Sequence, residues 1–461
     1  MKPSSELFTT LPEHRAKVER LLASFGTDAT GPVALSKKTS NLFRERERGA
    51  VGRLDVRALN RTLSVDAQAQ TAETEGMTTF EDFADACLLH GCVPPVVPEL
   101  KTITVGGAIT GIGIESSSFR NGFVHETVME MDVLCGDGVV RLCTATNEHA
   151  DLFRAIPNSY GTLGYVLRAK LRVDRSRPIV ALSHRRIADR KAFLDCLREA
   201  CASGETDFVE GVVFAPGDHV VTTASFTAQA ARPSDYKGME IYHASLRRRA
   251  TDFLTARDYL WRWDPDWFWC SRVFGMENPL LRRLLGRWML RSSAYWKILT
   301  WYRKGKVEER VHALKRLLGR PIEFREPVIQ DVEIPFEHAD EFMEFYERFI
   351  DIRPCWVCPI VPGAAGRDWT LYPMEPGQLH LNFGFWESVP TTADLPSDHF
   401  NRLLEAEVVR LGGRKSLYSS VHFTEQEFWQ VHDRTAYVAL KDRYDPRRRF
   451  RDLYEKVVKG R

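Results

Sequence analysis

The feature that most constrains this chain is a glycine-rich stretch, residues 104–123, with the sequence TVGGAITGIGIESSSFRNGF. It holds five glycines and a run of three serines between two apolar segments that we expect to be strands. Because glycine has no Cβ, a ligand can approach the backbone closely there. Turns rich in glycine and serine also present concave sets of N–H donors that suit phosphate oxygens. The stretch therefore predicts a site where a large phosphorylated cofactor lies against the backbone.

Three other interpretations of this stretch have to be weighed. A dinucleotide fold needs G-x-G-x-x-G between a strand and a helix, with an acid about 20 residues later. Gly111 and Gly113 begin this pattern and Asp132 lies at a tolerable distance, but Ser116 stands where the last glycine should be. No G-x-x-x-x-G-K-[ST] motif occurs, which excludes a P-loop. A glycine-rich β-turn without any ligand stays open as an alternative.

Composition excludes several classes of protein. At 461 residues the chain is long enough for two or three domains with a large core. Its formal net charge of +2 argues against a general binder of polyanions. Nine cysteines show no paired framework, which predicts a reduced, cytoplasmic setting. We see no signal peptide, and no window approaches about 18 uninterrupted apolar residues, so we expect no spanning helix.

Aromatic and basic residues concentrate in residues 253–306. Seven of the eleven tryptophans fall between Trp261 and Trp301, and no acidic residue occurs between Asn278 and Val307. Apolar and basic residues alternate there at helical spacing, which is typical of a helix in a membrane interface. We interpret the block as a membrane-facing surface; the alternative is an internal helix whose arginines pair with acids elsewhere. Nucleic acid is a poorer partner because the aromatic residues share the apolar stripe.

The order of patterns along the chain predicts an α+β fold in four parts. Residues 1–30 are expected to be a helical lead, 31–175 a strand-rich domain, and 176–410 a second α+β domain. Residues 411–461 are expected to return to the first domain and close the site. In the second domain, VIQDVEIP, PCWVCPIV and QLHLNFGFW are predicted to be strands. The segment KSLYSSVHF in the last part is also predicted to be a strand, and TTFEDFADACLLHGC in the first domain is predicted to be an amphipathic helix.

Several sequence runs together resemble a known superfamily. The runs VVPELKTITVGGAITGIGIESSSFRNGFVHE, DLFRAIPNSYGTLGYV, IQDVEIP, WVCP and EQEFW resemble the PCMH-type flavoproteins of the vanillyl-alcohol-oxidase superfamily. Within it the chain resembles the Δ24-sterol reductases, the seladin/Diminuto group, from about residue 36 to the C-terminus. The resemblance implies a PCMH-type FAD-binding domain over 31–175, a substrate or cap domain over 176–410, and a closing segment over 411–461.

The resemblance also implies which residues bind FAD. The residues that match the family's FAD stretch are Thr104, Val105, Gly106, Gly107, Ala108, Ile109, Thr110, Gly111, Ile112, Gly113, Ile114, Glu115 and Ser116, extended by Ser117, Ser118 and Gly122. The residues that match a first diphosphate loop are Lys37, Lys38, Thr39, Ser40 and Asn41. The residues that match a second glycine turn are Gly161, Thr162, Leu163, Gly164 and Val166.

Two departures from the superfamily pattern refine the expectation. The loop at residues 37–41 has no histidine that could bond covalently to the flavin, so FAD should be held non-covalently. The leading membrane helix of animal and plant sterol reductases has no counterpart here, so we expect a soluble or peripheral protein whose membrane contact is the 253–306 block. No metal site is expected: the lone C-x-x-C of Cys355 and Cys358 is read as two buried strand cysteines.

The expected reaction is reduction of a carbon–carbon double bond in a sterol-like or isoprenoid lipid. Hydride would come from the reduced flavin and a proton from a protein acid, with NADPH as the electron donor implied by the resemblance. Tyr418 and His422 are the predicted catalytic residues, because residues four apart on a strand point the same way. His422 stands where the sterol reductases have tyrosine, and Lys415 is less favoured. Glu115 is expected to hydrogen-bond the cofactor or its loop.

Two rival functions stay open. A flavin oxidase or dehydrogenase would remove hydride from an alcohol or a lipid-linked sugar, since decaprenylphosphoryl-ribose oxidases have a strand resembling GGRKSLYSS. A flavin-stabilised membrane scaffold without turnover would bind FAD and exchange electrons with nothing. The sequence does not determine the oligomeric state.

Overall fold

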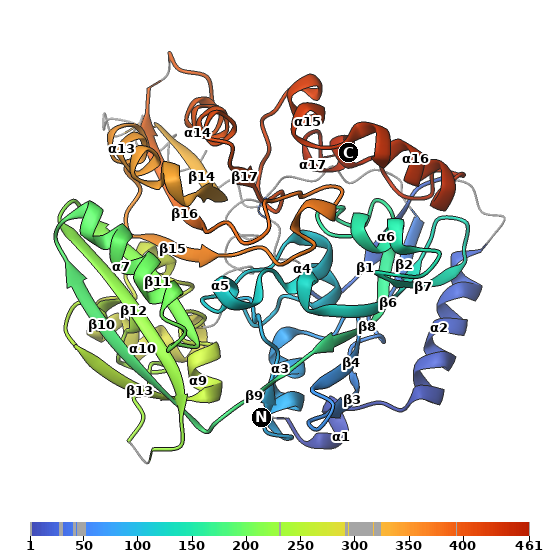
Figure 1. The fold of residues 1–461 in the computed structure, drawn as a ribbon, viewed down its shortest axis with the longest axis horizontal. Coiled ribbons are helices and arrows are strands. Elements are labelled where there is room, and N and C mark those ends of the chain that lie inside the picture. Colours follow the sequence, from blue (N-terminus) through green and yellow to red (C-terminus); the bar gives the residue numbers. More distant parts are fainter. Residues whose placement is uncertain are drawn as a thin grey trace.

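Two antiparallel sheets lie side by side and carry helices on both (Figure 1). The computed structural model describes residues 2–26, 31–39, 43, 52–229, 232–290, 294, 317, 324–392 and 394–460. One sheet has five strands, all between residues 62 and 172, and the other has eight, all between residues 179 and 415. This arrangement confirms the α+β fold class.

The helix expected near the start of the chain is present as α2, Leu11–Phe25, which follows the short α1, Ser4–Leu7. Thr10 caps it by accepting from the backbone N–H of Glu13, and the Glu13 carboxylate accepts from the backbone N–H of Thr10. The helix packs its apolar side into a cluster that also includes residues from the strands and from the C-terminus. A small parallel pair follows it, formed by β1 (Val33–Ser36) and β2 (Gly52–Asp55).

The five-stranded sheet has the order β3-β4-β8-β6-β7. Its strands are β3 (Thr62–Asp66), β4 (Thr71–Glu75), β6 (Val128–Leu134), β7 (Val140–Thr144) and β8 (Tyr165–Arg172). The elements between and beside these strands are α3 (Phe80–Leu88), β5 (Cys92–Val93), α4 (Val105–Gly111), α5 (Ser118–Asn121), the 3₁₀ turn Val124–Thr127, α6 (Ala150–Ala155) and β9 (Asp174–Arg175). The amphipathic helix predicted from TTFEDFADACLLHGC is thereby confirmed as α3.

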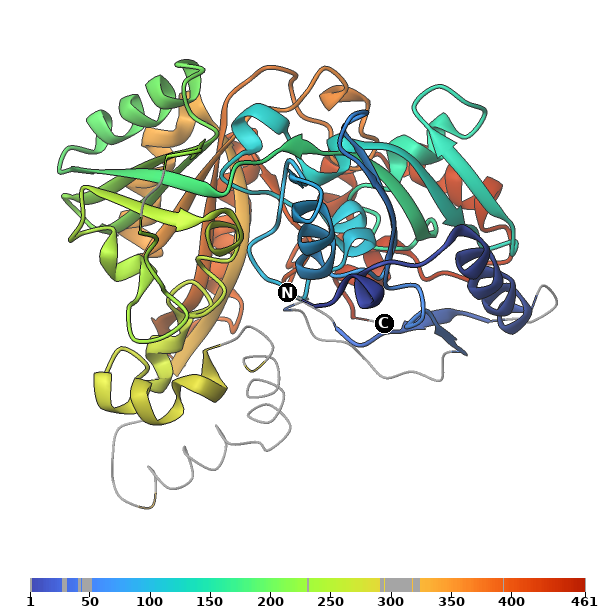
Figure 2. The same cartoon turned by 90° about the horizontal axis from the view of Figure 1, so that it is seen from below.

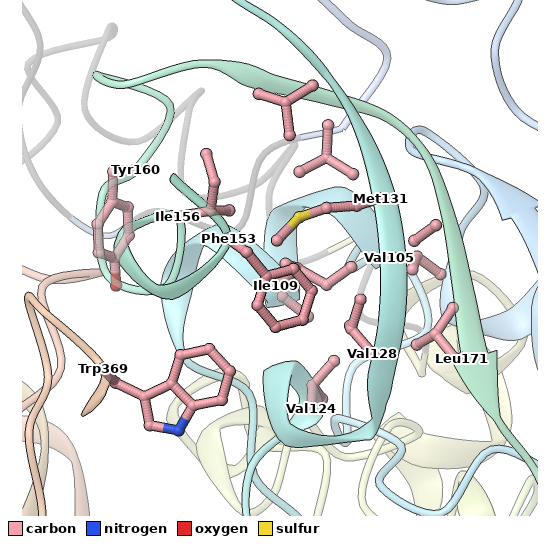
Figure 3. Packing of buried hydrophobic residues seen from close by; sticks show 14 of the residues in the cluster. Val105, Ile109, Val124, Val128, Met131, Phe153, Ile156, Tyr160, Leu171 and Trp369 are labelled. Atoms are coloured by element: carbon pink, nitrogen blue, oxygen red, sulfur yellow. The ribbon is translucent and has the colours of Figure 1, made fainter. Parts of the chain in front are cut away.

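The first part of the glycine stretch folds as a helix, α4, and not as the turn between strands that the sequence suggested. Thr104 caps it, because its side chain accepts a hydrogen bond from the backbone N–H of Gly107. Val105 and Ile109 lie four residues apart on one face and pack against the sheet (Figure 3). Burial of that face offsets the low helix propensity of the glycines, which is why the expectation was wrong.

The eight-stranded sheet has the order β13-β10-β12-β11-β15-β16-β14-β17 and is antiparallel throughout. Its strands are β10 (Ile179–Ile187), β11 (Phe208–Ala215), β12 (Asp218–Thr227), β13 (Thr251–Thr255), β14 (Phe324–Pro335), β15 (Cys355–Ile360), β16 (His380–Thr391) and β17 (Arg414–Lys415). The strands predicted from VIQDVEIP, PCWVCPIV and QLHLNFGFW are confirmed as β14, β15 and β16.

Helices α7 (Arg190–Ala202), α13 (Ala339–Phe349) and α14 (His399–Arg410) cover one face of this sheet (Figure 1). A typical contact there is that of Phe342 with Phe383, whose ring centroids are 4.8 Å apart. The opposite face carries aromatic side chains, among them Trp356, that pack towards the five-stranded half. The cavity described below lies on this second side.

The described tryptophans of the 253–306 block are buried, so they are not membrane anchors. Helix α8 (Tyr242–Ser245) precedes the block, and β13 overlaps its start. The described part of the block then forms α9 (Ala256–Leu260), the 3₁₀ turn Cys270–Phe274 and α10 (Pro279–Met289). Trp261, Trp263, Trp267 and Trp269 are at most 3% exposed and belong to the core. This corrects the sequence interpretation, because tertiary packing against β15 and β16 uses the aromatic side chains that we assigned to a lipid surface.

The leucines of α10 behave differently from those tryptophans. Leu280 and Leu284 are 73% and 75% exposed, while Arg282 is buried and pairs with Asp266 at 2.6 Å. The helix thus buries one arginine and exposes apolar side chains, the reverse of an ordinary surface helix. The segment lies at the far end of the eight-stranded half, beyond β14 (Figure 2).

The C-terminal part returns to the five-stranded half through α15 (Glu425–Val431), α16 (Arg434–Tyr444) and α17 (Leu453–Val457). Lys441 Nζ donates to the carbonyl of Thr162 at 2.9 Å and is paired with Asp445. The strand predicted from KSLYSSVHF is wrong beyond Lys415: β17 has only two residues, and residues 416–424 form a loop. Strand β17 pairs with β14 at two positions, Arg414 with Glu333 and Lys415 with Val332. The residues after Lys415 have no strand pairing in the described structure and therefore form a loop.

Candidate active site

A cavity of about 240 Å³ lies between the two halves of the molecule. One wall is formed by α4 with its flanking loops, and the opposite wall by aromatic and acidic side chains of the eight-stranded half. The lining residues from the first half are Lys37, Thr39, Phe43, Pro98, Glu99, Leu100, Ile103, Thr104, Gly107, Ala108, Thr110, Gly111, Ile112, Gly113, Ile114 and Tyr160. Those from the second half and the C-terminal loop are Trp267, Phe268, Cys270, Asp331, Trp356, Trp386 and Tyr418.

The α4 wall is bare backbone because its cavity side carries glycines. Gly107 and Gly111 line the cavity and are four residues apart, so they share a face of the helix. A Cβ on Gly111 would lie 3.3 Å from the ring of Tyr160, whose hydroxyl donates to the Gly111 carbonyl at 3.0 Å. The opposite side of α4 also needs glycine, since a Cβ on Gly106 would lie 2.8 Å from the carbonyl oxygen of Gly76. The helix is therefore held close to the sheet on one side and open to a ligand on the other.

The chain leaves α4 through a sharp change of direction. Ile112 has a φ of +58°, in the left-handed region. A Cβ on Gly113 would lie 2.7 Å from Val124 Cγ2 and 3.0 Å from Pro98 Cγ, so this position requires glycine. The loop before the helix and the loop after it thus meet at the cavity, which places Glu99, next to Pro98, on the same wall.

The structure brings ten of the predicted FAD-binding residues to the cavity. They are Lys37, Thr39, Thr104, Gly107, Ala108, Thr110, Gly111, Ile112, Gly113 and Ile114. Two others, Ser40 and Asn41, lie outside the described residues. The remaining predicted residues do not line the cavity, and they are Lys38, Val105, Gly106, Ile109, Glu115, Ser116, Ser117, Ser118, Gly122, Gly161, Thr162, Leu163, Gly164 and Val166. Their role in FAD binding stays a prediction.

Several members of that last group hold the surroundings of the cavity in place. The Ser117 hydroxyl donates to the carbonyl of Pro95 at 2.6 Å. A Cβ on Gly164 would lie 2.4 Å from Val133 Cγ1, so this glycine permits close packing of the second turn on β6. Val105 and Ile109 are core residues. These contacts shape the wall without forming its surface.

Tyr418 lies at the cavity, as expected for a catalytic residue, and sequence reasoning missed its two partners. Trp386 Nε1 donates to the Tyr418 hydroxyl oxygen at 2.9 Å. Asp331 accepts from Asn382 Nδ2 at 3.0 Å and is hydrogen-bonded to Tyr418. Burial raises the pKa of Asp331 to about 6 although these two hydrogen bonds oppose the shift. The alternation in VIQDVEIP was the available signal, since it puts Asp331 and Glu333 on one face of β14.

His422, the other predicted catalytic residue, does not share this wall with Tyr418. Its Nδ1 lies 3.2 Å from Asp398 Oδ2, and its backbone N–H donates to the Glu405 carboxylate. It lines a separate pocket of about 530 Å³, and burial lowers its pKa. The expectation that the two side chains point the same way was wrong, because residues 418–422 form a loop and not a strand.

Lys415 also serves the fold and not the cavity. Its ammonium group is buried and contacts the Glu405 carboxylate and the carbonyl of Ser420, the latter at 2.6 Å. Burial lowers the pKa of Lys415, while Glu405 opposes that shift. The lysine therefore ties the loop that carries Tyr418 to α14.

A second cluster of acidic side chains, which the sequence did not reveal as a cluster, lies behind the α4 wall. Arg262 Nη2 contacts three buried carboxylates: Glu210 at 2.8 Å, Glu115 at 3.0 Å and Glu99 at 3.2 Å. Since Glu99 and Glu115 belong to the loops around α4 while Glu210 and Arg262 belong to the second half, this Arg262 cluster joins the two halves at the cavity. The sequence signals were Glu115, which was expected to hydrogen-bond the cofactor or its loop and accepts from the Ser116 hydroxyl, and Glu99, five residues before Thr104.

The three carboxylates of the Arg262 cluster differ in their surroundings. Glu210 accepts from the indole N–H groups of Trp263 and Trp356, both at 3.0 Å, and although burial opposes it, Arg262 with these donors lowers the pKa of Glu210. Burial raises the pKa of Glu99 well above the usual range and the neighbouring Glu115 adds to the shift, although Arg262, at 3.2 Å, opposes it. Neither oxygen of Glu99 accepts a well-aligned hydrogen bond among the described residues. Glu210 is thus held ionised, whereas Glu99 favours its protonated form.

Comparisons with known proteins agree with this geometry. Residues 8–144 match the family described as "FAD binding domain". The chain is similar to the Delta(24)-sterol reductase of Homo sapiens, with 27% identity over 417 residues that cover 86% of this chain and 76% of the relative. It is similar to the Delta(24)-sterol reductase of Arabidopsis thaliana, with 24% identity over 88% of this chain and 77% of the relative. A shorter match of 119 residues is 33% identical to the decaprenylphosphoryl-beta-D-ribose oxidase of Mycolicibacterium smegmatis, over 26% of each chain.

The cavity fits the cofactor that these matches imply. The glycine face of α4 leaves backbone exposed at Gly107 and Gly111, where a Cβ would narrow the space, and Lys37 adds a positive charge to the same wall. Flat aromatic side chains on the opposite wall leave a slot for a ring system. In the part of the chain that the structure describes, no helix is long and apolar enough to cross a membrane. The chain is an FAD-dependent oxidoreductase with a PCMH-type FAD-binding domain, similar over most of its length to the Delta(24)-sterol reductases.

Proposed function

We propose that this protein reduces a carbon–carbon double bond of a sterol-like or isoprenoid lipid, with NADPH as the electron donor. The observation that carries the proposal is the similarity to proteins named Delta(24)-sterol reductase over 86–88% of the chain. The aromatic wall of the cavity supports it, since Trp267, Phe268, Trp356 and Trp386 offer an apolar surface to a lipid.

FAD supplies the hydride, and the residues of this chain supply placement and the proton. Lys37, Thr39 and the glycine face of α4 would hold the cofactor. An isolated double bond is neither polarised nor acidic, so its reduction needs an acid on the wall that faces it. Tyr418, with Asp331 beside it, lies on the wall opposite α4, whereas His422 lies in another pocket.

The alternative function is that of an FAD-dependent oxidase or dehydrogenase acting on an alcohol or a lipid-linked sugar. The short match to decaprenylphosphoryl-beta-D-ribose oxidase favours it. That match covers 26% of this chain, against 86% for the human sterol reductase, so we place the reductase first.

An anaerobic experiment separates the two. The purified protein, loaded with FAD, is mixed with NADPH while the flavin absorbance is followed. Bleaching by NADPH, then return of the oxidised spectrum on addition of an unsaturated sterol or polyprenoid, is the expected result. Bleaching by an alcohol in the absence of NADPH would favour the oxidase and contradict the reductase.

The lipid substrate has to reach the cavity, and we propose that α10 binds the surface of an anionic membrane for this purpose. Val273, Phe274, Leu280, Leu281, Leu284 and Leu285 are exposed on α10 and the 3₁₀ turn before it. Cys270, at the start of that turn, lines the cavity. The sequence from Asn278 to Val307 has no acidic residue and, besides the buried Arg282, seven basic residues, which complements anionic headgroups.

Flotation with vesicles that contain an anionic phospholipid tests this surface. Each buried leucine contributes about 1.5–3 kcal/mol to transfer out of water. The double variant Leu280→Asp/Leu284→Asp should therefore lose most of its vesicle binding. Leu89→Asp, on an exposed position of the other half, is the matched control and should bind like the unmodified protein. Unchanged binding of the double variant would show that α10 is not the membrane contact.

A further inference from the structure

On the cavity wall opposite α4, the hydrogen bonds give Tyr418 and Asp331 different roles. Trp386 donates to the Tyr418 oxygen, so the hydroxyl proton of Tyr418 is free to point at its other partner, Asp331. Asn382 donates to Oδ1 of the same carboxyl group. Asp331 is therefore held in one orientation by two neutral donors while its side chain lines the cavity.

No cation stabilises the charged form of Asp331 in the described part of the chain. The groups that act on its pKa are its own burial, which raises it to about 6, and the hydrogen bonds from Asn382 and Tyr418, which lower it. The titratable groups whose charges interact with that of Asp331 are Glu333 on the same face of β14, Cys355 on β15 and Tyr418. The other titratable groups that line the same cavity are Lys37, Glu99, Tyr160 and Cys270. Burial raises the pKa of Glu333 to about 8, so this neighbour is mostly neutral at pH 7. Asp331 thus exchanges a proton close to neutrality.

Acid strength decides which of the two groups can protonate a double bond. An alkene is a very weak base, so the stronger acid on the wall has the advantage. Burial, and then the nearby Asp331, raise the pKa of the Tyr418 phenol well above its usual value of 10. The Asp331 carboxyl is therefore the stronger acid by at least four pKa units, a factor of about 10⁴.

We propose that Asp331 gives its proton to the carbon–carbon double bond, and that Tyr418 is a positioning residue that orients the Asp331 carboxyl. This inference rests on the reductase function proposed above and replaces Tyr418 with Asp331 as the proton donor. It assigns a role to a residue on the central region of β14, whose place in the sheet fixes the donor rigidly.

The step balances. The O–H bond of the Asp331 carboxylic acid breaks, and the π bond of the alkene breaks as its electron pair forms a C–H bond at one carbon, which leaves the other carbon electron-deficient. The hydride that completes the second C–H bond comes from the reduced cofactor, which was itself reduced by NADPH. Asp331 is left as a carboxylate and takes one proton from water before the next turnover, so each cycle consumes one NADPH and one proton.

Three variants test the proposal by the rate at which an unsaturated sterol reoxidises the NADPH-reduced protein, measured across pH. Asp331→Asn should slow this step by about 100-fold or more, because a positioned acid contributes at least that much, and its rate should no longer change around pH 6. Asp331→Glu should restore part of the rate together with a pH dependence. Asp394→Asn, at an exposed position, is the matched control and should leave the rate unchanged.

Tyr418→Phe distinguishes a positioning residue from a donor. In the unmodified protein the rate should fall as the pH rises through about 6, because the protonated acid is the active form. Removal of the Tyr418 hydrogen bond destabilises the carboxylate, so the midpoint of Tyr418→Phe should move to higher pH while most of the rate at low pH is kept. A flat pH profile with a 100-fold loss in Tyr418→Phe, and a near-normal rate in Asp331→Asn, would overturn the proposal.

Infrared spectroscopy gives a measurement that does not depend on turnover. A C=O stretching band of a protonated carboxyl group should disappear on raising the pH through about 6, and Asp331→Asn should lack this band. A band that is unchanged in Asp331→Asn would contradict the assignment. If no unsaturated lipid reoxidises the unmodified protein, the reductase function itself fails; if it does so but Asp331→Asn keeps its rate and pH profile, only the Asp331 assignment fails.

Discussion

The two acidic groups that border the cavity differ in what surrounds them. In the Arg262 cluster, a buried guanidinium contacts Glu99, Glu115 and Glu210, and two indole N–H groups complete the shell of Glu210. On the cavity wall opposite α4, Asp331 has no ion-pair partner among the described residues, and two neutral donors, Asn382 and Tyr418, hold its carboxyl group.

The comparison shows how one protein uses the same chemical group in two ways. A buried carboxylate with a cation and several N–H donors stays ionised, joins two parts of a fold and resists titration. A carboxyl group with few donors and an open cavity beside it keeps a proton near neutral pH and can release it to a ligand. We infer that the Arg262 cluster is structural and that the Asp331 pair is chemical.

The largest effect is expected from Arg262→Met. This change leaves the ionised carboxylate of Glu210 buried without its cation, and breaking a buried pair in this way costs about 3–5 kcal/mol. The free energy of unfolding, measured in denaturant at pH 7, should fall by that amount, and the deficit should shrink at lower pH as the Glu210 carboxylate takes up a proton.

Arg198→Met is the control for that measurement, because Arg198 is exposed, pairs with Asp195 on its own helix and lies over the ring of Phe336 at 5.0 Å. It should change the stability by less than about 1 kcal/mol. A loss of similar size in both variants would mean that the buried position of Arg262 does not matter, and the comparison drawn above would break.

A smaller effect is expected on stability from Asp331 as the pH changes. Its pKa in the folded protein, about 6, lies above the ordinary aspartate value of 3.8 that applies in the unfolded chain. The folded state therefore holds the extra proton between these values, and stability falls as the pH rises through this window. The full shift corresponds to about 3 kcal/mol, an upper limit because Asp331 is only partly buried.

The variant Asp331→Asn removes this pH-dependent contribution to the free energy of unfolding. The unfolding free energy of the variant, relative to the unmodified protein, should rise by up to about 3 kcal/mol between pH 4 and pH 6, measured in denaturant with saturating FAD. A constant difference across this range would indicate that Asp331 is ionised throughout, and the distinction between the two acidic groups would be lost.

The smallest effect is expected from His422→Gln. The side chain lies in a different pocket and contacts Asp398, and its backbone N–H, which binds Glu405, is unaffected by the change. Turnover should change by less than about 2-fold, since the group does not reach the reacting atoms. A loss comparable to that of Asp331→Asn would mean that the loop over residues 416–424 brings His422 to the cavity during the reaction.

Sequence patterns predicted much of the fold. The α+β class, helix α3, and strands β14, β15 and β16 followed from hydrophobic periodicity, because the side chains that form these elements repeat at their characteristic spacing. The failures came where local signals compete with packing. Glycine disfavours a helix locally, so α4 looked like a turn, and only the burial of Val105 and Ile109 makes it helical.

The other errors have a similar cause. Trp261, Trp263, Trp267 and Trp269 have the composition of a membrane interface, but the fold buries all four. Trp263 and Trp269 pack in the cluster on the second sheet, and Trp261 packs in the core of the five-stranded half. Composition describes which side chains need a partner and does not describe whether that partner is lipid or protein.

By itself, the sequence determined that residues 104–113 expose a glycine-rich backbone, which predicted a site for a phosphorylated cofactor, and the resemblance implied FAD. The physical reason is that glycine has no side chain, so the sequence alone shows where a ligand can approach the backbone. The tertiary structure decided which acids face that site. Glu99, Asp331 and Tyr418 are separated by up to 319 residues in the chain, and their partners depend on contacts between the two sheets that no local pattern encodes.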